Sequence, residues 1–402
     1  MTCRICGAPT ERVLDLGEMP PANRLKDSLE QFEKSYPLVM EYCRECSNLQ
    51  LQYCVDAAEL YANYLYVTPD SPSLEAHYAK LIGRLASQGY IDKSSFVVEF
   101  GSNVGSFLRR LKPEVARILG IDPAENICAI ARERGIETEC RYFGPETAEE
   151  IRSTRGPADL IVARHCAAHN ENPHLLIEGV TGLLSPDGVF LMENAYGLET
   201  LRNFEVGQVY HEHMFFFTVQ AVERLFAMHG MRLLDVSIEP VHGGSVVFAA
   251  ARAESRHPTL PSVAEHRELE RAALTPSLLA EFPRRLEEMR RQVRGLVDTA
   301  VGSGQSIWLY GASAKASTFV NYVGLTREEI PYCADSTPVK QGRFLPRANI
   351  MVRPEMEAFG AAPDYFLITA WNYADEIVAK IRANCGTRPR IIVPHPTVAV
   401  LS

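Results

Sequence analysis

The sequence predicts an α/β protein of three parts: an N-terminal cysteine-bearing module, a central Rossmann-like domain and a C-terminal Rossmann-like α/β domain. Two Cys-x-x-Cys pairs occur within the first fifty residues, and a strand that runs into a glycine turn and a helix occurs twice, near residues 100 and 311. At about 150 residues per domain, 402 residues are enough for two or three domains. We place the domains at residues 1–70, 71–255 and 256–402.

The composition excludes several classes of protein. The 41 Lys and Arg residues against 50 Asp and Glu give a net charge of −9, so the overall field of the molecule repels nucleic acid. No apolar run is long enough to span a bilayer, and the N-terminus lacks the pattern of a signal peptide. Four of the ten cysteines form two close pairs and the others are scattered, which is typical of a reducing compartment. We therefore expect a cytoplasmic protein with a small-molecule substrate, without nucleic acid or membrane partners.

The two cysteine pairs, Cys3 with Cys6 and Cys43 with Cys46, indicate a zinc site. Each pair places two thiols on one tight turn, and two such turns supply the four thiolates of a closed tetrahedral site. The 36 residues between the pairs exceed the usual spacing of zinc ribbons. Four free thiols in a core are the alternative, and a redox role is less favoured because no βαβ pattern surrounds the pairs. A zinc ion held by four thiolates has no open position for water, so the predicted ion is structural.

The central domain begins with a buried-strand pattern over residues 96–100, which runs into Gly101-Ser-Asn-Val-Gly105 and a helix. Glycines in such a turn let the backbone approach a ligand closely. A second strand over residues 117–122 ends in Asp122, whose carboxylate can bind a ribose diol. The pattern predicts a nucleoside cofactor, although similar turns also occur in other α/β enzymes.

The end of the central domain distinguishes a methyltransferase from a dehydrogenase. Residues 231–239 and 244–253 are strand-like and are joined by a short turn at His242 and Gly243, which predicts an antiparallel hairpin closing a parallel sheet. That ending favours a methyltransferase over a dehydrogenase, with S-adenosylmethionine (SAM) as cofactor. In this interpretation Asp122 lies against the ribose, and four residues of the turn lie against the methionine end. The four are Glu99, Gly101, Asn103 and Gly105.

A titratable cluster, Tyr210-His-Glu-His213, precedes the aromatic run at residues 214–217. Desolvation against such an apolar wall shifts pKa values and can produce a general base. His165 and His169 follow a strand that ends near residue 163, at the edge where doubly wound sheets bind ligands. For the histidines of the Tyr210–His213 cluster, the alternative is a pair of hydrogen-bonded core histidines or a metal site. For His165 and His169, the alternative is a solvated loop.

The C-terminal domain repeats the strand, turn and helix pattern. Residues 263–301 have apolar side chains at helical spacing and predict one or two amphipathic helices with a solvated charged face. A strand over residues 306–310 leads into Gly311-Ala-Ser-Ala-Lys315, whose backbone amides can hold a diphosphate. Asp335 ends a later strand at a position that suits a ribose hydroxyl. We expect a second nucleoside site here, and a structural domain without a ligand is the alternative.

These parts, in this order, resemble the deoxysugar C-methyltransferases, which act on nucleotide-linked 4-keto sugars. The resemblance covers nearly the whole chain. Its most specific pieces are Tyr210-His-Glu-His213, His242-Gly-Gly-Ser245, Gly311-Ala-Ser-Ala-Lys315, Lys340-Gln-Gly342 and Ala370-Trp-Asn372. It implies a structural zinc ion, a central class I SAM-dependent methyltransferase domain, and a C-terminal domain that holds the substrate nucleotide. It also points to antibiotic or surface-glycan assembly.

The resemblance implies roles for individual residues. His213 is the expected general base, and Tyr210, Glu212 and His169 position it or polarise the sugar ketone. The base forms an enolate at the carbon beside the ketone, and that carbon takes the methyl group. The substrate is expected to be a dTDP-linked sugar. The residues assigned to it are Tyr66, His242, Gly311, Ser313, Ala314, Lys315 and Asp335.

The chain departs from the family pattern at two places. Val104 stands where an Asn-Asp-Gly turn is common, and residues 164–170 are unusually polar because of Arg164, His165 and Asn170. The acceptor therefore stays open, since another sugar, another ring position or a different acceptor fits the same fold. Further alternatives are a nucleotide-sugar epimerase or reductase with a nicotinamide cofactor, and a catalytically dead scaffold. No patterned interface helix decides the oligomeric state, which stays open, with a monomer as one possibility.

Overall fold

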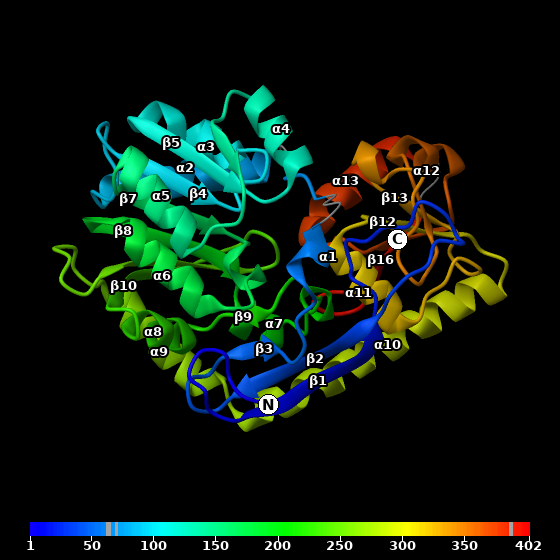
Figure 1. Ribbon diagram of the computed structural model, residues 1–402. Coiled ribbons are helices and arrows are strands. Elements are labelled where there is room, and N and C mark those ends of the chain that lie inside the picture. Colours follow the sequence, from blue (N-terminus) through cyan, green and yellow to red (C-terminus); the bar gives the residue numbers. More distant parts are fainter. Residues whose placement is uncertain (62–65, 69–70, 386–388) are drawn as a thin grey trace.

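The computed structural model contains three β-sheets and describes the chain except residues 62–65, 69–70 and 386–388. A seven-stranded and a six-stranded sheet form two lobes, and a four-stranded antiparallel sheet lies below both in Figure 1. The four-stranded sheet has the order β1-β2-β3-β9. Its strands are β1 (Thr10–Met19), β2 (Tyr36–Cys43), β3 (Leu49–Leu51) and β9 (Phe215–Phe216), and helix α1 (Ala57–Tyr61) follows β3.

The central sheet has the order β10-β11-β8-β7-β4-β5-β6. Its strands are β4 (Phe96–Phe100), β5 (Arg117–Asp122), β6 (Thr138–Cys140), β7 (Ala158–Arg164), β8 (Leu184–Ala195), β10 (Met231–Glu239) and β11 (Ser245–Arg252). Its helices are α2 (Pro72–Ser87), α3 (Ser106–Leu111), α4 (Glu125–Glu133), α5 (Pro145–Arg155), α6 (Pro173–Leu183), α7 (Gly197–Arg202) and α8 (Val219–Ala227), with single 3₁₀ turns η1 (Lys112–Glu114), η2 (Ala167–His169) and η3 (Val206–Gln208). Strand β11 runs antiparallel to both β8 and β10, so the predicted hairpin is confirmed.

The C-terminal sheet has the order β14-β13-β12-β15-β16-β17, and β17 pairs antiparallel with β16. Its strands are β12 (Ile307–Tyr310), β13 (Tyr332–Ala334), β14 (Met351–Arg353), β15 (Tyr365–Ile368), β16 (Arg390–Val393) and β17 (Ala399–Leu401). Its helices are α11 (Ala314–Val323), α12 (Glu355–Ala361) and α13 (Ala374–Asn384), with turns η4 (Pro338–Lys340) and η5 (Trp371–Tyr373). The amphipathic region predicted at residues 263–301 forms two helices, α9 (Pro261–Ala273) and α10 (Pro276–Gly302).

Each parallel sheet reverses its strand order at one point, and the two glycine turns lie at these points. In the central sheet, β5 and β7 flank β4 on opposite sides, and in the C-terminal sheet β13 and β15 flank β12 in the same way. Ligands of open α/β sheets bind outside the carboxyl ends of the strands at such a reversal. The turns after β4 and β12 are therefore placed where the sequence predicts two nucleoside sites.

The N-terminal sheet joins the two lobes. Apolar residues of β1 and β2, such as Leu14 and Met40, share a hydrophobic cluster with α10 and the C-terminal sheet. The cysteine loops share a second cluster with the central sheet. Strand β9, which comes from the middle of the chain, completes the N-terminal sheet by pairing Phe216 with Leu49. No cysteine pattern predicts this sheet, because its last strand lies far away in the sequence.

The predicted domain boundaries stay predictions. The boundary at residue 70 falls outside the described residues, and β9 shows that the N-terminal sheet is not built from residues 1–70 alone. Among the described residues, no helix combines the length and apolar character needed to cross a bilayer.

The lobes meet closely at Gly207 in η3. A Cβ atom at this glycine would overlap the Trp371 ring and lie 3.0 Å from Cβ of Lys315. We expect Gly207→Ala to lower the free energy of unfolding by about 1–3 kcal/mol, because the lobes must separate to admit the methyl group. Urea denaturation measures the change. The matched control is Gly295→Ala in α10, where a Cβ meets nothing within 4 Å; this change should be neutral or stabilising. Equal stability of the two variants would contradict the prediction.

Candidate functional site

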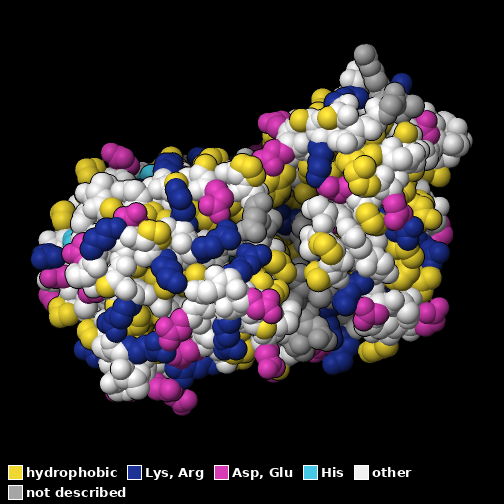
Figure 2. Space-filling model, turned by 90° about the horizontal axis from the view of Figure 1, so that it is seen from above, with side chains coloured by type: hydrophobic (Ala, Val, Ile, Leu, Met, Phe, Trp, Pro, Cys, Tyr) yellow, Lys and Arg dark blue, Asp and Glu magenta, His cyan; other side chains and the backbone are white. Residues whose placement is uncertain are grey.

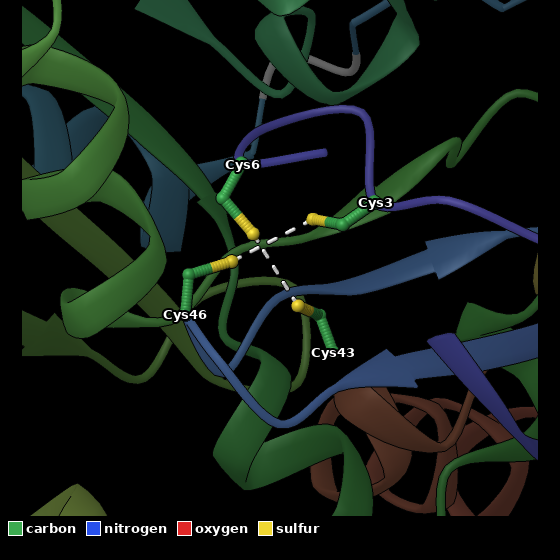
Figure 3. A group of neighbouring side chains, drawn as sticks. All are labelled: Cys3, Cys6, Cys43 and Cys46. Carbon is green, nitrogen blue, oxygen red and sulfur yellow. Dashed lines mark hydrogen bonds between the residues drawn. The ribbon is translucent and has the colours of Figure 1, made fainter. Parts of the chain in front are cut away.

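The four cysteines of the two predicted pairs converge on one point. Cys3 and Cys6 lie on the first loop, Cys43 ends β2 and Cys46 lies in the turn before β3, with their sulfur atoms pointing toward one another (Figure 3). The four Sγ atoms all lie within 4.8 Å of one another, and the closest pairs are 3.5 and 3.6 Å apart. A zinc ion with Zn–S bonds of about 2.3 Å places four tetrahedral sulfur atoms at about this spacing. The cluster therefore fits the predicted closed site.

Neighbouring donors also suit thiolate sulfur. The backbone N–H of Ile5 donates to Sγ of Cys3 at 3.4 Å, and the Asn48 side-chain amide donates to the same atom at 3.6 Å. Such second-sphere donors orient metal ligands and stabilise their charge. Four thiolates occupy every position of a tetrahedral zinc ion, so these residues would hold an ion that organises the fold.

A cavity of about 310 Å³ opens at the carboxyl edge of the central sheet. Three of the predicted cofactor residues line it, namely Gly101, Asn103 and Asp122. Gly101 has φ +61°, and a Cβ there would come within 2.5 Å of Cys166, so the backbone can follow this path only with glycine. Asp122 accepts backbone N–H bonds from Asn103 and Ala124, both at 3.0 Å, which ties the glycine turn to the loop after β5.

The other two predicted cofactor residues lie behind this wall. Gly105 begins α3 at φ +73°, and a Cβ there would overlap Ile136. Glu99 is fully buried and pairs with Arg164 at 2.9 Å, and the Arg164 side chain lines the cavity. Burial raises the pKa of Glu99 to about 7, although the nearby guanidinium opposes this effect. Arg164 thus presents the positive charge of a buried pair to the cavity.

Arg164 and Val104, the residues at the two departures from the family pattern, both lie near the central cavity. Arg164 lies over the rings of Tyr78 and Phe107, 4.5 and 4.7 Å from their centroids. Val104 is fully buried in a small apolar cluster with Ala124 and Ile127. The carboxylate that Val104 replaces would have no place there without a partner.

A second cavity, of about 320 Å³, opens at the carboxyl edge of the C-terminal sheet. All seven predicted substrate residues line it: Tyr66, His242, Gly311, Ser313, Ala314, Lys315 and Asp335. Ser313 caps α11, because its side chain accepts a bond from the backbone N–H of Ala316 at 3.2 Å. Asp335 accepts N–H bonds from Ala312 and Thr337, at 2.7 and 2.8 Å. Asp335 thus repeats the arrangement of Asp122, and each carboxylate keeps lone pairs for a ligand.

The two cavities meet at a shared wall between the lobes, where the surface is hollowed in Figure 2. Four side chains line both cavities: Tyr66, His165, His169 and His242. The His165 and His242 rings are in edge contact, with centroids 4.5 Å apart. A group bound in one cavity therefore faces a group bound in the other across this wall.

His213 lines the C-terminal cavity and has a defined tautomer. Its Nδ1 lies 2.9 Å from the carbonyl oxygen of Gln208, so Nδ1 carries the proton and donates it. Its Nε2 is then a lone-pair acceptor, and the Tyr210 hydroxyl donates to it at 2.6 Å. Burial holds the pKa of His213 well below its usual range, and the Lys315 ammonium lowers it further. The ring is neutral, and the Tyr210 hydroxyl must move aside before the Nε2 lone pair can accept a proton from a substrate.

The remaining members of the titratable cluster differ in position. Glu212 is buried and accepts a bond from the Asn23 amide at 2.9 Å, and it lines neither cavity. His211 also lines neither cavity and contacts the carbonyl oxygen of Tyr36. Of the cluster, Tyr210 and His213 face the C-terminal cavity.

Several lining residues have no predicted role, although the sequence places His165 at the ligand-binding edge of the central sheet. Asn23, Gln208 and Thr337 line the C-terminal cavity, and Arg164 and His165 line the central one. The unusual polarity of residues 164–170 is a sequence signal for the last two. No local pattern marks Asn23, whose partner Glu212 is 189 residues away.

The sheet order with its inserted antiparallel strand and the ligand cavity at the strand reversal define a class I SAM-dependent methyltransferase. Three family models match: "C-methyltransferase C-terminal domain" at residues 240–396, a zinc binding domain at 3–61, and "Methyltransferase domain" at 73–236. The chain is 36% identical over 405 residues to the C-methyltransferase NovU of Streptomyces niveus, covering 100% of this chain and 96% of NovU. This protein belongs to that C-methyltransferase family.

Solved structures are similar to part of the chain. Magnesium protoporphyrin IX methyltransferase from Synechocystis, with bound S-adenosylhomocysteine (SAH), is 15% identical with a TM-score of 0.36, and the match covers 45% of this chain and 84% of that one. A SAM-dependent methyltransferase from Anabaena variabilis is 17% identical with a TM-score of 0.40, and the match covers 48% and 90%.

We expect Cys43→Ser to remove most of the zinc from the protein, because a hydroxyl is a poor replacement for a thiolate in a four-sulfur site. Wild-type protein should contain one zinc ion per chain, and the variant should lose more than about 4 kcal/mol of unfolding free energy through loss of the metal. Elemental analysis and thermal unfolding measure these changes. The matched control is Cys54→Ser, a half-buried cysteine outside the cluster. Metal-free wild-type protein with an intact N-terminal sheet would contradict the prediction.

The buried Glu99 predicts a pH dependence of stability. Its pKa is about 7 in the folded protein and near 4.5 in the unfolded chain, so its contribution is present below pH 4.5 and is lost as the pH rises through 7. Between pH 5 and pH 8, we expect wild-type protein to lose about 2–3 kcal/mol relative to Glu99→Gln, whose side chain does not titrate. Urea denaturation at the two pH values measures the difference. Parallel pH profiles of the two proteins would show that Glu99 does not titrate in this range.

Proposed function

We propose that the chain transfers the methyl group of SAM to a carbon beside the ketone of a nucleoside-diphosphate 4-keto deoxysugar. His213 removes the proton from that carbon in this proposal. The observation that carries it is the shared wall: the cavity beside His213 and the cavity of the methyltransferase sheet meet at Tyr66, His165, His169 and His242. A substrate carbon next to His213 is thereby brought close to the cofactor side.

The central cavity would hold the cofactor through Gly101, Asn103 and Asp122, with the remaining carboxylate lone pairs of Asp122 toward the ribose. When bound, SAM supplies an electrophilic methyl group carried on a sulfonium. Neutral histidines at the shared wall suit this positive ligand, since the pKa of His169 and that of His242 are both lowered to about 4, chiefly by burial.

The C-terminal cavity has the chemistry of a nucleotide site. The backbone N–H groups that begin α11 and the buried ammonium of Lys315 suit a diphosphate. Lys315 donates to the carbonyl oxygen of His242, which links this cation to the shared wall. A diphosphate bound there opposes the charge of Lys315, which lowers the pKa of His213. Substrate binding would therefore make His213 a stronger base.

His169 suits the ketone oxygen. Its Nε2 is buried and has no hydrogen-bond partner among the residues that the structure describes, and its ring lies 5.4 Å from that of His213. A buried polar atom without a partner is costly, so a ligand atom at this position would be stabilised. A neutral imidazole N–H directed at the ketone stabilises the enolate oxygen that forms when His213 takes the proton.

In this proposal Glu212 acts through other residues and does not line either cavity. Its bond to Asn23 fastens the turn that carries Tyr210 and His213 to the loop before β2, in the zinc-bearing part of the chain. Glu212 therefore positions the base.

The test is solvent deuterium exchange at the acidic carbon of dTDP-4-keto-6-deoxyglucose with SAH bound, so that no methyl transfer occurs. We expect His213→Gln to slow this exchange by about 100-fold or more, the usual contribution of a general base, while SAH and thymidine diphosphate still bind in calorimetric titrations. The matched control is His211→Gln, two residues away and outside both cavities, which should keep the exchange. Exchange by His213→Gln at the wild-type rate would rule out His213 as the base. If thymidine diphosphate does not bind to wild-type protein, the nucleotide-sugar substrate is wrong.

A further inference from the structure

A line of buried titratable side chains runs from the shared wall to the protein surface. Its members come from four separate places: the loop after β7, the end of β8, helix α2 and the end of β10. In order from the inside, they are His165, Glu193, His77, Glu239 and Lys80. The sequence assigns none of the five a role, although it places His165 at the ligand-binding edge of the central sheet.

The inner end lies in the reaction cavity. His165 lines both cavities, and its backbone has φ +52°, a conformation that is costly for a side chain of this size. Its backbone N–H donates to the carbonyl oxygen of Glu193 at 2.7 Å, which holds the residue there. Its Nε2 lies 3.5 Å from the Ser245 hydroxyl and 3.9 Å from Oε1 of Glu193. The ring thus reaches from the cavity toward the Glu193 carboxylate.

The middle of the line is a carboxylate and an imidazole inside the protein. Nε2 of His77 lies 2.7 Å from Oε1 of Glu193, and the two side chains are 4% and 1% exposed. The contact is a close ion pair rather than an aligned hydrogen bond, because neither Nε2 of His77 nor either Glu193 oxygen has a hydrogen-bond partner among the described residues. Burial raises the pKa of Glu193, but His77 and Arg164 lower it, and the result is a carboxylate that ionises more readily than usual. The pair therefore keeps a charge in the interior, where an unpaired one would be very costly.

The outer end reaches solvent. Nδ1 of His77 lies 3.9 Å from Oε2 of Glu239, so the ring joins the two carboxylates through its two nitrogen atoms. Glu239 is itself buried, and Lys80 contacts it at 2.7 Å with a side chain that is 66% exposed. Gaps of 3.9 Å are longer than a hydrogen bond, and a small side-chain movement closes them.

C-methylation releases a proton, which has to leave the cavity. The C–H bond of the acceptor breaks, its electron pair forms the bond to the methyl carbon, and the neutral thioether SAH leaves from the sulfonium. One proton is released in each turnover and stays in the cavity on the base. The base must lose this proton before the next turnover, and acceptors built into the wall can take it.

We propose that His165, Glu193, His77 and Glu239 form a proton outlet that carries the proton of each turnover from the methyl-transfer cavity to solvent beside Lys80. The proposal rests on C-methylation and does not depend on which acceptor is methylated or on which residue is the base. Each imidazole accepts a proton on one nitrogen and releases one from the other, and each carboxylate accepts and releases a proton in turn, so every group returns to its first state.

The charged groups around the inner end support this direction of transfer. Burial, His242, Arg164, His213 and Lys315 all lower the pKa of His165. A proton on His165 is therefore unstable, and the lowered pKa of Glu193 likewise keeps its carboxylate from retaining a proton. The surroundings favour passage of the proton over its storage.

The test is turnover of dTDP-4-keto-6-deoxyglucose with SAM by His77→Gln in weakly buffered solution. We expect kcat to fall about 10-fold to 100-fold, because the outlet is broken, with the KM for SAM unchanged. Small imidazole buffers should restore kcat as their concentration rises, since a mobile base can collect the proton from the cavity. A merely structural role for His77 gives no dependence on buffer concentration, and that result would overturn the proposal. If His77→Gln does not fold, Glu239→Gln is judged by the same buffer dependence.

A matched pair of surface variants provides the control. Lys80 with Glu239 and Arg84 with Asp235 are both ion pairs between α2 and β10, and only the first pair belongs to the line. Lys80→Met should produce a smaller, buffer-dependent loss, and Arg84→Met should produce none. Equal buffer dependence in both would also overturn the proposal.

A second measurement needs no acceptor and separates this proposal from the proposed function. In the histidine NMR spectrum, His77→Gln leaves the Glu193 carboxylate without its partner, so its charge should raise the pKa of His165 by about one unit or more. Arg84→Met should leave that titration unchanged. If wild-type protein does not turn over the sugar but this shift occurs, the acceptor is wrong and the outlet stands. Without the shift, His165 and His77 are not linked and the outlet is wrong.

Discussion

The chemistry of this protein depends on holding the carboxyl edges of two parallel sheets against each other. The N-terminal sheet and α10 provide that constraint, because apolar residues of β1 and β2 pack against the C-terminal lobe while the cysteine loops pack against the central lobe. Burying one large apolar side chain contributes about 1.5–3 kcal/mol, whereas an exposed ion pair contributes about 0–1 kcal/mol. The many surface ion pairs of α10 are therefore secondary to its buried face, which includes Phe282, Leu286 and Val293.

The zinc-binding region then has a role beyond its own stability. Its loop carries Asn23, which lines the C-terminal cavity and donates a hydrogen bond to Glu212, one residue before His213. The same region receives β9, which follows His213 directly in the chain. The turn that carries His213 is thus fixed on one side by Asn23 and on the other by the strand pairing of Phe215 and Phe216. A closed metal site far from the chemistry can affect it only through such contacts.

Short-range patterns predicted much of this structure. The strand, glycine turn and helix units at Gly101 and Gly311 follow from local burial and backbone freedom, and the closing hairpin follows from two adjacent strand patterns. Contacts between distant segments left no local pattern. The local sequence does not show that Phe216 completes the N-terminal sheet or that Glu99 pairs with Arg164. It also does not show that Glu212 points away from the C-terminal cavity while His213 faces it. These outcomes depend on which face of each element is buried after the lobes meet.

The polarity of residues 164–170 has an electrostatic explanation in the assembled site. Arg164 and Lys315 place two buried cations near the shared wall, and each lowers the pKa of His165. A further positive charge on any wall histidine would repel both cations and a sulfonium ligand. Burial keeps His169 and His242 neutral for the same reason that it keeps His213 neutral, so the site collects hydrogen-bonding groups without adding charge. The carboxylates behind the wall and a bound substrate would then supply the negative charge that compensates Arg164 and Lys315. The basicity of the wall histidines would therefore depend on whether substrate is bound.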